Sequence, residues 1–157
     1  MPLVSKLVFA FVRWKARHGL RDFGNDLERT NEEARRTGVH GETYAYWYLR
    51  NQGYIFVARN FVPRRAKGEL DLVGYDGETL AFVEVRTRTV REEMTALPEL
   101  SVTPEKQGIV ARTARHFLAE RHVRDCPCRF DVLAIDNYPG KPPEVRLHKD
   151  AFSPQLH

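Results

Sequence analysis

The stretch Gly68–Arg86 reads GELDLVGYDGETLAFVEVR and decides the fold of this chain. Two runs with strand character, Glu69–Tyr75 and Thr79–Arg86, flank the sequence Tyr-Asp-Gly-Glu, which is a strong hairpin signal. A hairpin of this kind places its two strands side by side and antiparallel. The rest of the fold is therefore expected to form around a two-stranded antiparallel unit.

The hairpin carries acidic side chains on one of its faces. Asp71 lies opposite Phe82 if the loop has two residues and opposite Glu84 if it has four, but Asp71 and Glu84 share a face in either register. Neighbouring carboxylates repel unless a positive group lies between them. Two explanations stay open: a divalent Mg²⁺ or Mn²⁺ ion, or neutralisation by Arg86 or Lys67 on a solvated face. The flanking residues expected to face a core are Leu70, Leu72, Ala81, Val83 and Val85.

Outside the hairpin, helical and extended patterns alternate along the chain. Gly53 is expected to end the first helix, because a left-handed cap costs glycine little. Thr103 and Pro104 are typical of a helix start. The expected elements are a helix over 38–53, a strand over 54–60, a long mobile loop over 86–102, a helix over 103–122, and strands over 129–136 and 144–148. This order predicts an α/β fold with a mixed central β-sheet flanked by helices.

Each predicted helix carries one charged residue on its inward stripe. A rotation of 100° per residue places Glu42 beside Ala45, Tyr46 and Leu49. A carboxylate there either binds or pairs with a cation, or is favoured simply because it lies near the helix N-terminus. Lys106 lies on the stripe of the later helix. Its ammonium group either reaches out to solvent or stabilises charge at a phosphate.

Basic residues bracket the acidic hairpin and indicate the kind of partner. Four precede it and three follow Glu84: Arg59, Arg64, Arg65 and Lys67, then Arg86, Arg88 and Arg91. Cations on loops around a small acidic site suit the phosphate backbone of DNA or another nucleic acid. The aromatic residues within 44–48 either stack on bases or pack in the core.

Composition limits the chain to a single domain with a short extra arm. Its 157 residues carry 25 Lys and Arg against 21 Asp and Glu, a net charge of +4. Two cysteines, Cys126 and Cys128, are too few for a disulfide-rich scaffold. The apolar segment 3–12 is too short to span a bilayer, and an N-terminal helical arm over 1–37 is expected instead. These features favour a cytoplasmic protein without integral membrane association.

Several short motifs, taken together, resemble the YraN family, a group of small bacterial proteins classed as predicted endonucleases. The motifs are Gly41-Glu42, Arg59-Asn60, Gly68-Glu69-Leu70-Asp71-Leu72, Phe82-Val83-Glu84-Val85, Lys106 and Arg129-Phe130-Asp131-Val132. The resemblance covers about residues 38–152. It implies a restriction-endonuclease-like domain over 38–157, in the PD-(D/E)XK superfamily and similar to Holliday-junction resolvases. Such resolvases often act as homodimers, which makes a homodimer one expectation here.

The resemblance also implies a site and an activity. By position, Glu42, Asp71 and Glu84 are the expected ligands of Mg²⁺ or Mn²⁺, and the superfamily's lysine position holds Arg86. Lys106 is the candidate to replace that lysine. The first hypothesis is a metal-dependent endonuclease that hydrolyses DNA, on branched or single-stranded structures, with these five residues as its catalytic group.

Two other hypotheses stay open. In the first alternative, the chain is a non-catalytic nucleic-acid-binding protein that keeps the nuclease fold, because arginine stays protonated and cannot act as a base. In that case DNA binding would be sensitive to salt and would not need Asp71. In the second alternative, the chain is an adaptor that uses its N-terminal arm to bind a protein or a membrane surface. The acids are then merely solvated.

Overall fold

The computed structural model describes residues 7, 10, 40–90 and 102–154. Of the predicted arm over 1–37, only Leu7 and Ala10 are described, and both are helical and exposed. The predicted domain boundary at residue 38 lies outside the described residues. Arg91 and most of the loop predicted after Arg86 also lie outside them.

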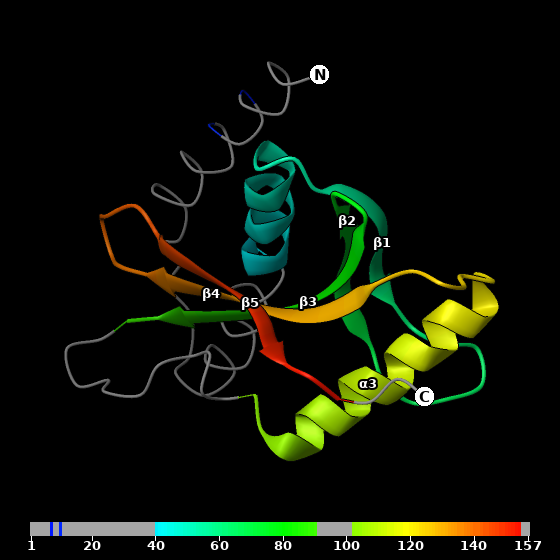
Figure 1. The fold of residues 1–157 in the computed structure, drawn as a ribbon. Coiled ribbons are helices and arrows are strands. Elements are labelled where there is room, and N and C mark those ends of the chain that lie inside the picture. The colour runs from blue at the N-terminus through cyan, green and yellow to red at the C-terminus, as the bar shows by residue number, and fades with distance from the viewer. Residues whose placement is uncertain (1–6, 8–9, 11–39, 91–101, 155–157) are drawn as a thin grey trace.

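One five-stranded sheet forms the centre of the described chain, with strand order β1-β2-β3-β4-β5 (Figure 1). The elements are a helix over 40–51, β1 (Ile55–Phe61), β2 (Leu70–Asp76), β3 (Thr79–Thr89), α3 (Pro104–Glu120), β4 (Cys128–Asn137) and β5 (Glu144–Phe152). All neighbouring strands are antiparallel except β3 and β4, which are parallel. The prediction of an α/β fold with a mixed, helix-flanked sheet is confirmed, and the architecture is consistent with a restriction-endonuclease-like core.

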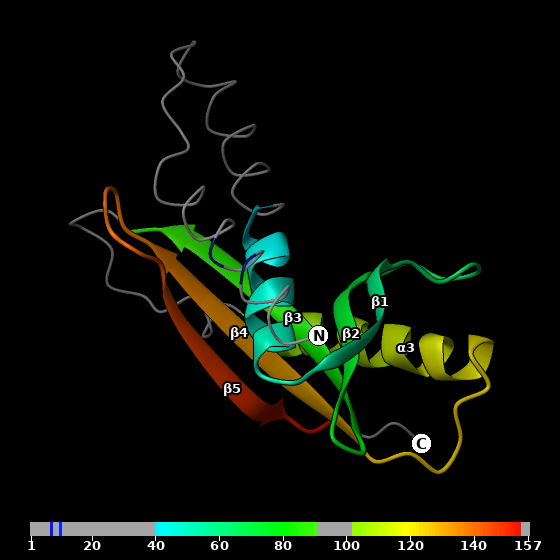
Figure 2. The same cartoon turned by 90° about the horizontal axis from the view of Figure 1, so that it is seen from above.

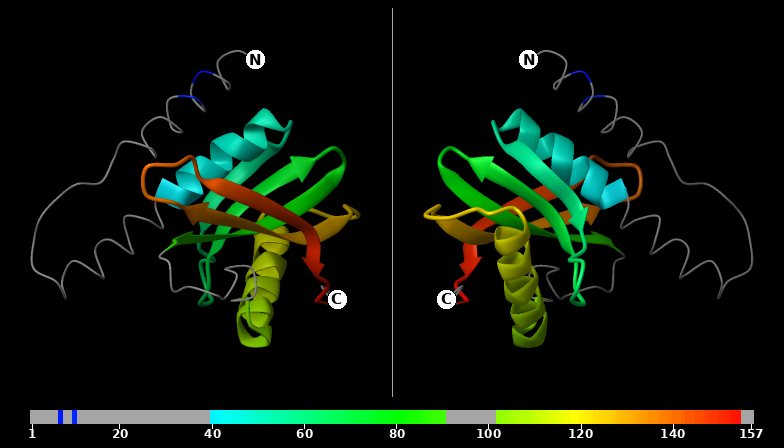
Figure 3. Two further views of the ribbon diagram at one scale, coloured as in Figure 1. Left: turned by 90° about the vertical axis from the view of Figure 1, so that its left-hand side faces the viewer. Right: turned by 90° about the vertical axis from the view of Figure 1, so that its right-hand side faces the viewer.

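The two helices cover opposite faces of this sheet (Figure 3). The 40–51 helix packs through Tyr44, Ala45 and Leu49 against a cluster that includes Leu72, Ala81, Val83 and Leu133. The opposite face packs against α3 through Val110, Ala114 and Phe117, with Leu80, Phe82 and Phe130 from the strands. Viewed from above, β1 and β2 turn away from the direction of β3, β4 and β5 (Figure 2). This strong twist follows from the right-handed preference of each strand.

The hairpin prediction is confirmed, but its register differs from the expectation for a short loop. Asp76 pairs with Thr79, so the turn contains two residues, and the regular ladder ends at Leu72 and Val83. One further step places Asp71 beside Glu84, whereas a two-residue loop was expected to place it beside Phe82. In an antiparallel pair the residue number falls by one on one strand for each step that it rises on the other. The pair of Leu72 and Val83 is therefore followed by the positions of Asp71 and Glu84.

One boundary and one packing face predicted for the hairpin are wrong. The strand β3 continues to Thr89, although a loop was expected from Arg86, because parallel pairing with β4 runs unbroken to Thr89 and Asn137. Leu70 was expected to pack with Leu72, but it belongs to the cluster under α3. The alternation of the strand is interrupted there, since Leu70 precedes the regular ladder with β3.

A close approach at Gly68 fixes the start of β2 against α3. Its backbone φ is +130°, and a Cβ atom at this position would lie 2.1 Å from Oγ1 of the buried Thr113. Both facts require glycine, since other residues avoid this conformation and the helix would have to move aside. The chain is therefore in direct contact with α3 at Gly68, just before it enters β2 and three residues before Asp71.

Gly68→Ala is expected to destabilise the protein by about 2–4 kcal/mol, through backbone strain and the clash with Thr113. Gly77→Ala is the matched control, since Gly77 also has a positive φ but no atom within 4 Å of the added methyl group. We expect that control to lose only about 1 kcal/mol. Denaturant unfolding of both variants provides the measurement, and equal losses would contradict the close approach.

Candidate active site

The candidate site lies where β2 and β3 separate, on the face covered by α3. Beyond the last regular pair, the backbone N–H of Val85 donates a hydrogen bond to the Asp71 carboxylate at 2.8 Å. The side chain of Asp71 thereby takes the place of a backbone acceptor at the end of the ladder. Asp71 is held at the opening between the two strands, next to Glu84.

Glu84 is a buried acid with two cationic neighbours. Only 3% of its side chain is exposed. Lys106 Nζ lies 3.2 Å from Glu84 Oε1, and Arg86 Nη2 lies 3.5 Å from the same oxygen. A carboxylate buried this deeply requires such partners, because removing an unpaired charge from water is strongly unfavourable. The prediction that Lys106 is directed at the acidic face of the sheet is therefore met by a direct ion pair.

The cap of α3 determines where Lys106 stands. Thr103 accepts a hydrogen bond from the backbone N–H of Lys106 at 3.3 Å, and Pro104 occupies the first turn. This is the local arrangement expected of a Thr-Pro helix start. It places Lys106 in the first helical turn, directly over Glu84.

Glu42 comes from the 40–51 helix and borders its buried stripe. The buried positions of this helix are Gly41, Tyr44, Ala45 and Leu49. Glu42 was predicted to lie on this stripe, but it is half-buried at its border. The helix approaches β3 closely at Gly41, where a Cβ atom would lie 1.9 Å from a threonine hydroxyl of that strand. This contact positions the following glutamate near the end of the sheet.

Asn60 is a site residue for which the sequence pattern predicted no role. Its side-chain amide donates a hydrogen bond to Glu42 Oε2 at 3.0 Å. Its backbone φ is +48°, a conformation that asparagine adopts more readily than most residues. The Arg59-Asn60 motif was the available signal, but the contact joins two elements whose relative placement no local pattern reveals.

Electrostatic coupling connects the three acids, which we call the acidic cluster: Glu42, Asp71 and Glu84. Burial, then the charge of Glu84 and, to a smaller extent, that of Glu42 together raise the pKa of Asp71 to about 7. The hydrogen bond from Val85 and the charge of Lys106 act in the opposite direction. Burial and the neighbouring carboxylates therefore outweigh the two groups that favour the ionised form of Asp71.

The acidic cluster has the donor chemistry that a hard divalent cation requires. Carboxylate oxygens are the preferred protein ligands of Mg²⁺ and Mn²⁺, and the charges of Glu84 and Glu42 add to burial in raising the pKa of Asp71. Within 40–90 and 102–154, no three Asp, Glu, His or Cys side chains are arranged closely enough to hold a metal ion. In the arrangement described, Glu84 is engaged by Lys106 and Arg86, and Glu42 by Asn60. A metal ion at the cluster would therefore require Glu84 to exchange one of these partners for it.

Arg86 carries a donor that suits an anionic ligand. Across the described residues, its buried Nε atom has no hydrogen-bond partner. Buried N–H groups are nearly always paired in folded proteins, so a free one beside a candidate site points to an acceptor supplied from outside. A phosphate oxygen is such an acceptor.

The predicted nucleic-acid-binding cations have different surroundings. Arg64, Arg65 and Lys67 are exposed on the loop over 62–69, which we call the basic loop. Arg59 lies 4.5 Å from the ring centroid of Tyr46 and donates weakly to Thr43. The basic loop and Arg59 therefore both remain on the surface.

Arg88 and the aromatic run have structural partners. Arg88 forms two hydrogen bonds with the buried Asp136, at 2.7 and 3.2 Å, which neutralise its charge inside the protein. Of the aromatic run, Tyr44 is buried, and Tyr46 and Tyr48 pack against the same cluster. Core packing therefore accounts for these three rings.

The Arg129-Phe130-Asp131-Val132 motif forms a buried network away from the acidic cluster. Arg129 bonds to the fully buried Asp131 at 2.8 Å and to Asp76 at 2.6 Å. Tyr54 and Lys149 join the same group. The network links β2, β4 and β5 with the chain that follows the first helix, so its observed role is structural.

Comparison with known proteins gives one consistent family. A family model described as "Uncharacterised protein family UPF0102" matches residues 41–135. A UPF0102 protein of Koribacter versatilis is 41% identical over 126 residues, covering 80% of this chain and 85% of the relative. One of Geotalea uraniireducens is 44% identical over 115 residues, covering 73% and 87%. One of Symbiobacterium thermophilum is 41% identical over 119 residues, covering 76% and 98%. The matched region contains the whole acidic cluster together with Arg86 and Lys106.

The helices in the described part of the chain lack the features of membrane-spanning helices. None of the helices there combines the length and the apolar composition that crossing a bilayer requires.

Proposed function

The chain belongs to the uncharacterised protein family UPF0102, the family of the YraN proteins it resembles, and we propose that it is a metal-dependent endonuclease acting on DNA. The observation that carries the proposal is the acidic cluster, with its buried Glu84 and the cations paired to it. Burial and the charge of Glu84 raise the pKa of Asp71 to about 7, and Glu84 itself pairs with Arg86 and Lys106. Perturbed carboxylates of this kind gather at functional sites more often than elsewhere.

In this proposal the acidic residues bind the metal ion and the basic residues contact the phosphate. Asp71 and Glu84 hold Mg²⁺ or Mn²⁺, and Glu42 contributes further negative charge. When bound, such an ion stabilises charge on a phosphate and lowers the pKa of a water molecule. Arg86 donates its free Nε–H to a phosphate oxygen, and Lys106 stabilises the charge that develops there. Water then adds to phosphorus as the P–O bond to the leaving strand breaks, and the departing oxygen takes up a proton.

The test is cleavage of DNA by the purified protein with Mg²⁺ or Mn²⁺, on duplex, single-stranded and four-way substrates. We expect nicking or resolution of at least one substrate, and its loss when EDTA removes the metal. Glu84→Gln should abolish it, whereas Glu78→Gln, an exposed turn acid, should not. Cleavage that persists in Glu84→Gln would contradict the proposal.

Arg86→Lys tests the position at which this chain departs from the superfamily pattern. The lysine keeps the charge but loses the planar donor fork, so we expect cleavage to fall by about tenfold. DNA binding should change little, because the charge is retained. Increased cleavage would instead show that Arg86 restrains the site.

The alternative is a non-catalytic DNA-binding protein with the same fold. One observation favours it: Lys106 and Arg86 already neutralise Glu84 without a metal. It predicts salt-sensitive DNA binding that is unaffected by EDTA, with no cleavage of any substrate. Isothermal titration of the protein with Mn²⁺ distinguishes the two functions, since only the nuclease requires a metal site.

A further inference from the structure

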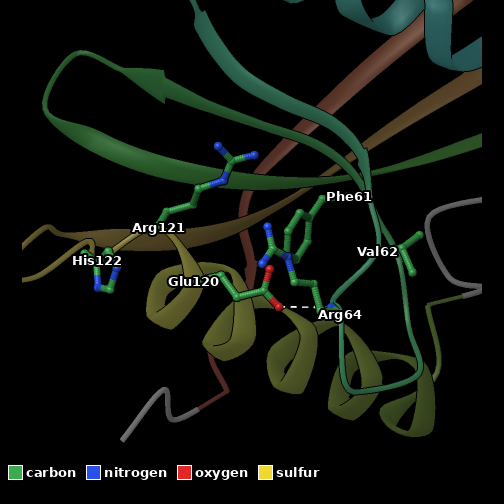
Figure 4. A pocket seen from close by; sticks show the side chains of 6 residues that line it. All are labelled: Phe61, Val62, Arg64, Glu120, Arg121 and His122. Carbon is green, nitrogen blue, oxygen red and sulfur yellow. Dashed lines mark hydrogen bonds between the residues drawn. The ribbon is translucent and has the colours of Figure 1, made fainter.

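A second candidate site lies at the end of α3 that is remote from the acidic cluster. A pocket of about 510 Å³ opens between the last residues of this helix and the chain that follows β1 (Figure 4). Its lining residues are Phe61, Val62, Arg64, Glu120, Arg121 and His122. Pockets of this volume are large enough for a small organic ligand.

The lining combines nitrogen-bearing side chains with an exposed apolar wall. Arg64, Arg121 and His122 supply the nitrogen groups, and Val62 is 60% exposed beside them. The one acid, Glu120, accepts the backbone N–H of Arg64 at 3.0 Å (Figure 4). It therefore joins the basic loop to α3. Cations beside an apolar surface fit a ligand with an anionic group and a flat apolar body, which is the chemistry of a nucleotide.

The helix α3 connects this pocket with the acidic cluster. Lys106, in its first turn, touches Glu84, and Glu120, at its end, touches the basic loop at Arg64. Between them, Gly68 lies against Thr113 in the middle of the helix. The basic loop therefore runs alongside α3 from the pocket towards Asp71. At 1.5 Å per residue, the two sites are about 20 Å apart along the helix axis.

We propose that this pocket binds an unpaired nucleotide of the same DNA strand whose phosphodiester lies at the acidic cluster. The proposal rests on the nuclease function proposed above. Arg65 and Lys67, exposed on the basic loop, contact the phosphates in between. At 3.4 Å per nucleotide, about six nucleotides span the distance. A concave pocket with an apolar wall selects an unpaired nucleotide, because a base inside a duplex cannot present its face.

The experiment measures DNA binding by fluorescence anisotropy in EDTA, so that no cleavage occurs. The probes are a blunt duplex and the same duplex with a single-stranded extension of about eight nucleotides. Arg121→Ala should weaken binding of the extended DNA by about 5- to 10-fold and of the blunt duplex by less than about twofold. Arg112→Ala, which removes an exposed arginine elsewhere on α3, should weaken both by less than about twofold.

If the pocket binds an unpaired nucleotide, DNA binding should depend on the length of the single-stranded extension and on the apolar wall of the pocket. Shortening the extension to about three nucleotides should remove the difference between Arg121→Ala and Arg112→Ala. Val62→Asp should reproduce the effect of Arg121→Ala. Equal behaviour of the two arginine variants, equal losses on both DNAs, or failure of the wild-type protein to bind either DNA would overturn the proposal.

The outcome is separable from that of the nuclease proposal. An Arg121→Ala effect on binding, in a protein that cleaves no substrate, supports the pocket and contradicts the nuclease. Cleavage that depends on Glu84, with no Arg121→Ala effect on binding, supports the nuclease and contradicts the pocket.

Discussion

An Asp71→Asn variant is expected to be more stable than the wild-type protein at pH 8 without metal, and to have lost about 100- to 1,000-fold of its cleavage activity. The asparagine can still accept the Val85 N–H bond, and its amide can donate to Glu84. It carries no charge to repel Glu84 or Glu42. Function and stability should therefore change in opposite directions at this one position.

The size of the stability gain follows from the pKa of Asp71. Burial and Glu84 raise it from 3.8 to about 7, so the folded state holds the proton more tightly than the unfolded chain. Stability is lost as pH rises between these two values, and the whole penalty is present above pH 7. Removing this penalty should increase the free energy of unfolding by about 2–4 kcal/mol at pH 8 and raise the melting temperature by about 4–10 °C.

The pH dependence distinguishes this cause from a general packing effect. At pH 4.5 most of the penalty has disappeared in the wild-type protein, so the advantage of Asp71→Asn should shrink to about a quarter. Asp125→Asn, at an exposed position, is the control and should give no such trend. Thermal unfolding of the three proteins at several pH values is the measurement. A gain of equal size at all pH values would contradict the assigned pKa.

Metal should reverse the order of stability. Mn²⁺ binds the folded wild-type protein and should raise its melting temperature at pH 8, whereas Asp71→Asn should respond little. The apparent Mn²⁺ affinity of the wild-type protein should also fall below pH 7, because protons compete for Asp71. An equal response of both proteins to Mn²⁺ would place the ion elsewhere.

Periodicity explains why part of this site could be predicted from the sequence. A strand alternates faces whatever its register, so Asp71 and Glu84 had to share a face even though a two-residue loop was expected to place Phe82 opposite Asp71. The inward stripe of the later helix likewise directed Lys106 at the sheet, and the Thr103 cap fixed its turn. These inferences depend on local geometry, which the sequence carries directly.

Contacts between distant elements could not be predicted in the same way. Arg88 appeared free for DNA because its partner, Asp136, comes from β4, where the two residues pair directly across the parallel strands. Asn60 meets Glu42 only because β1 ends beside the first helix. No local pattern encodes how β4 pairs or where a helix crosses a strand, so such partners require the tertiary structure.

Lys106→Met is expected to reduce cleavage by about 100-fold while leaving the fold intact. Methionine retains the apolar length of the lysine stem but lacks the ammonium group that lies 3.2 Å from Glu84. Arg86 remains close to Glu84, so the buried acid keeps one partner. Lys67→Met, on the exposed basic loop, is the matched control and should lower cleavage by no more than a few fold.

The metal affinity of Lys106→Met separates a catalytic role from a structural one. Lys106 competes with a metal ion for Glu84, so removing it should tighten Mn²⁺ binding by about two- to fivefold, although cleavage falls. An ion pair that merely supports the fold would instead leave a weaker metal site and a lower melting temperature. Tighter Mn²⁺ binding together with lost cleavage is the result expected if the Lys106 charge acts on the phosphate rather than on the metal. Full activity in Lys106→Met would show that its ammonium group merely neutralises Glu84.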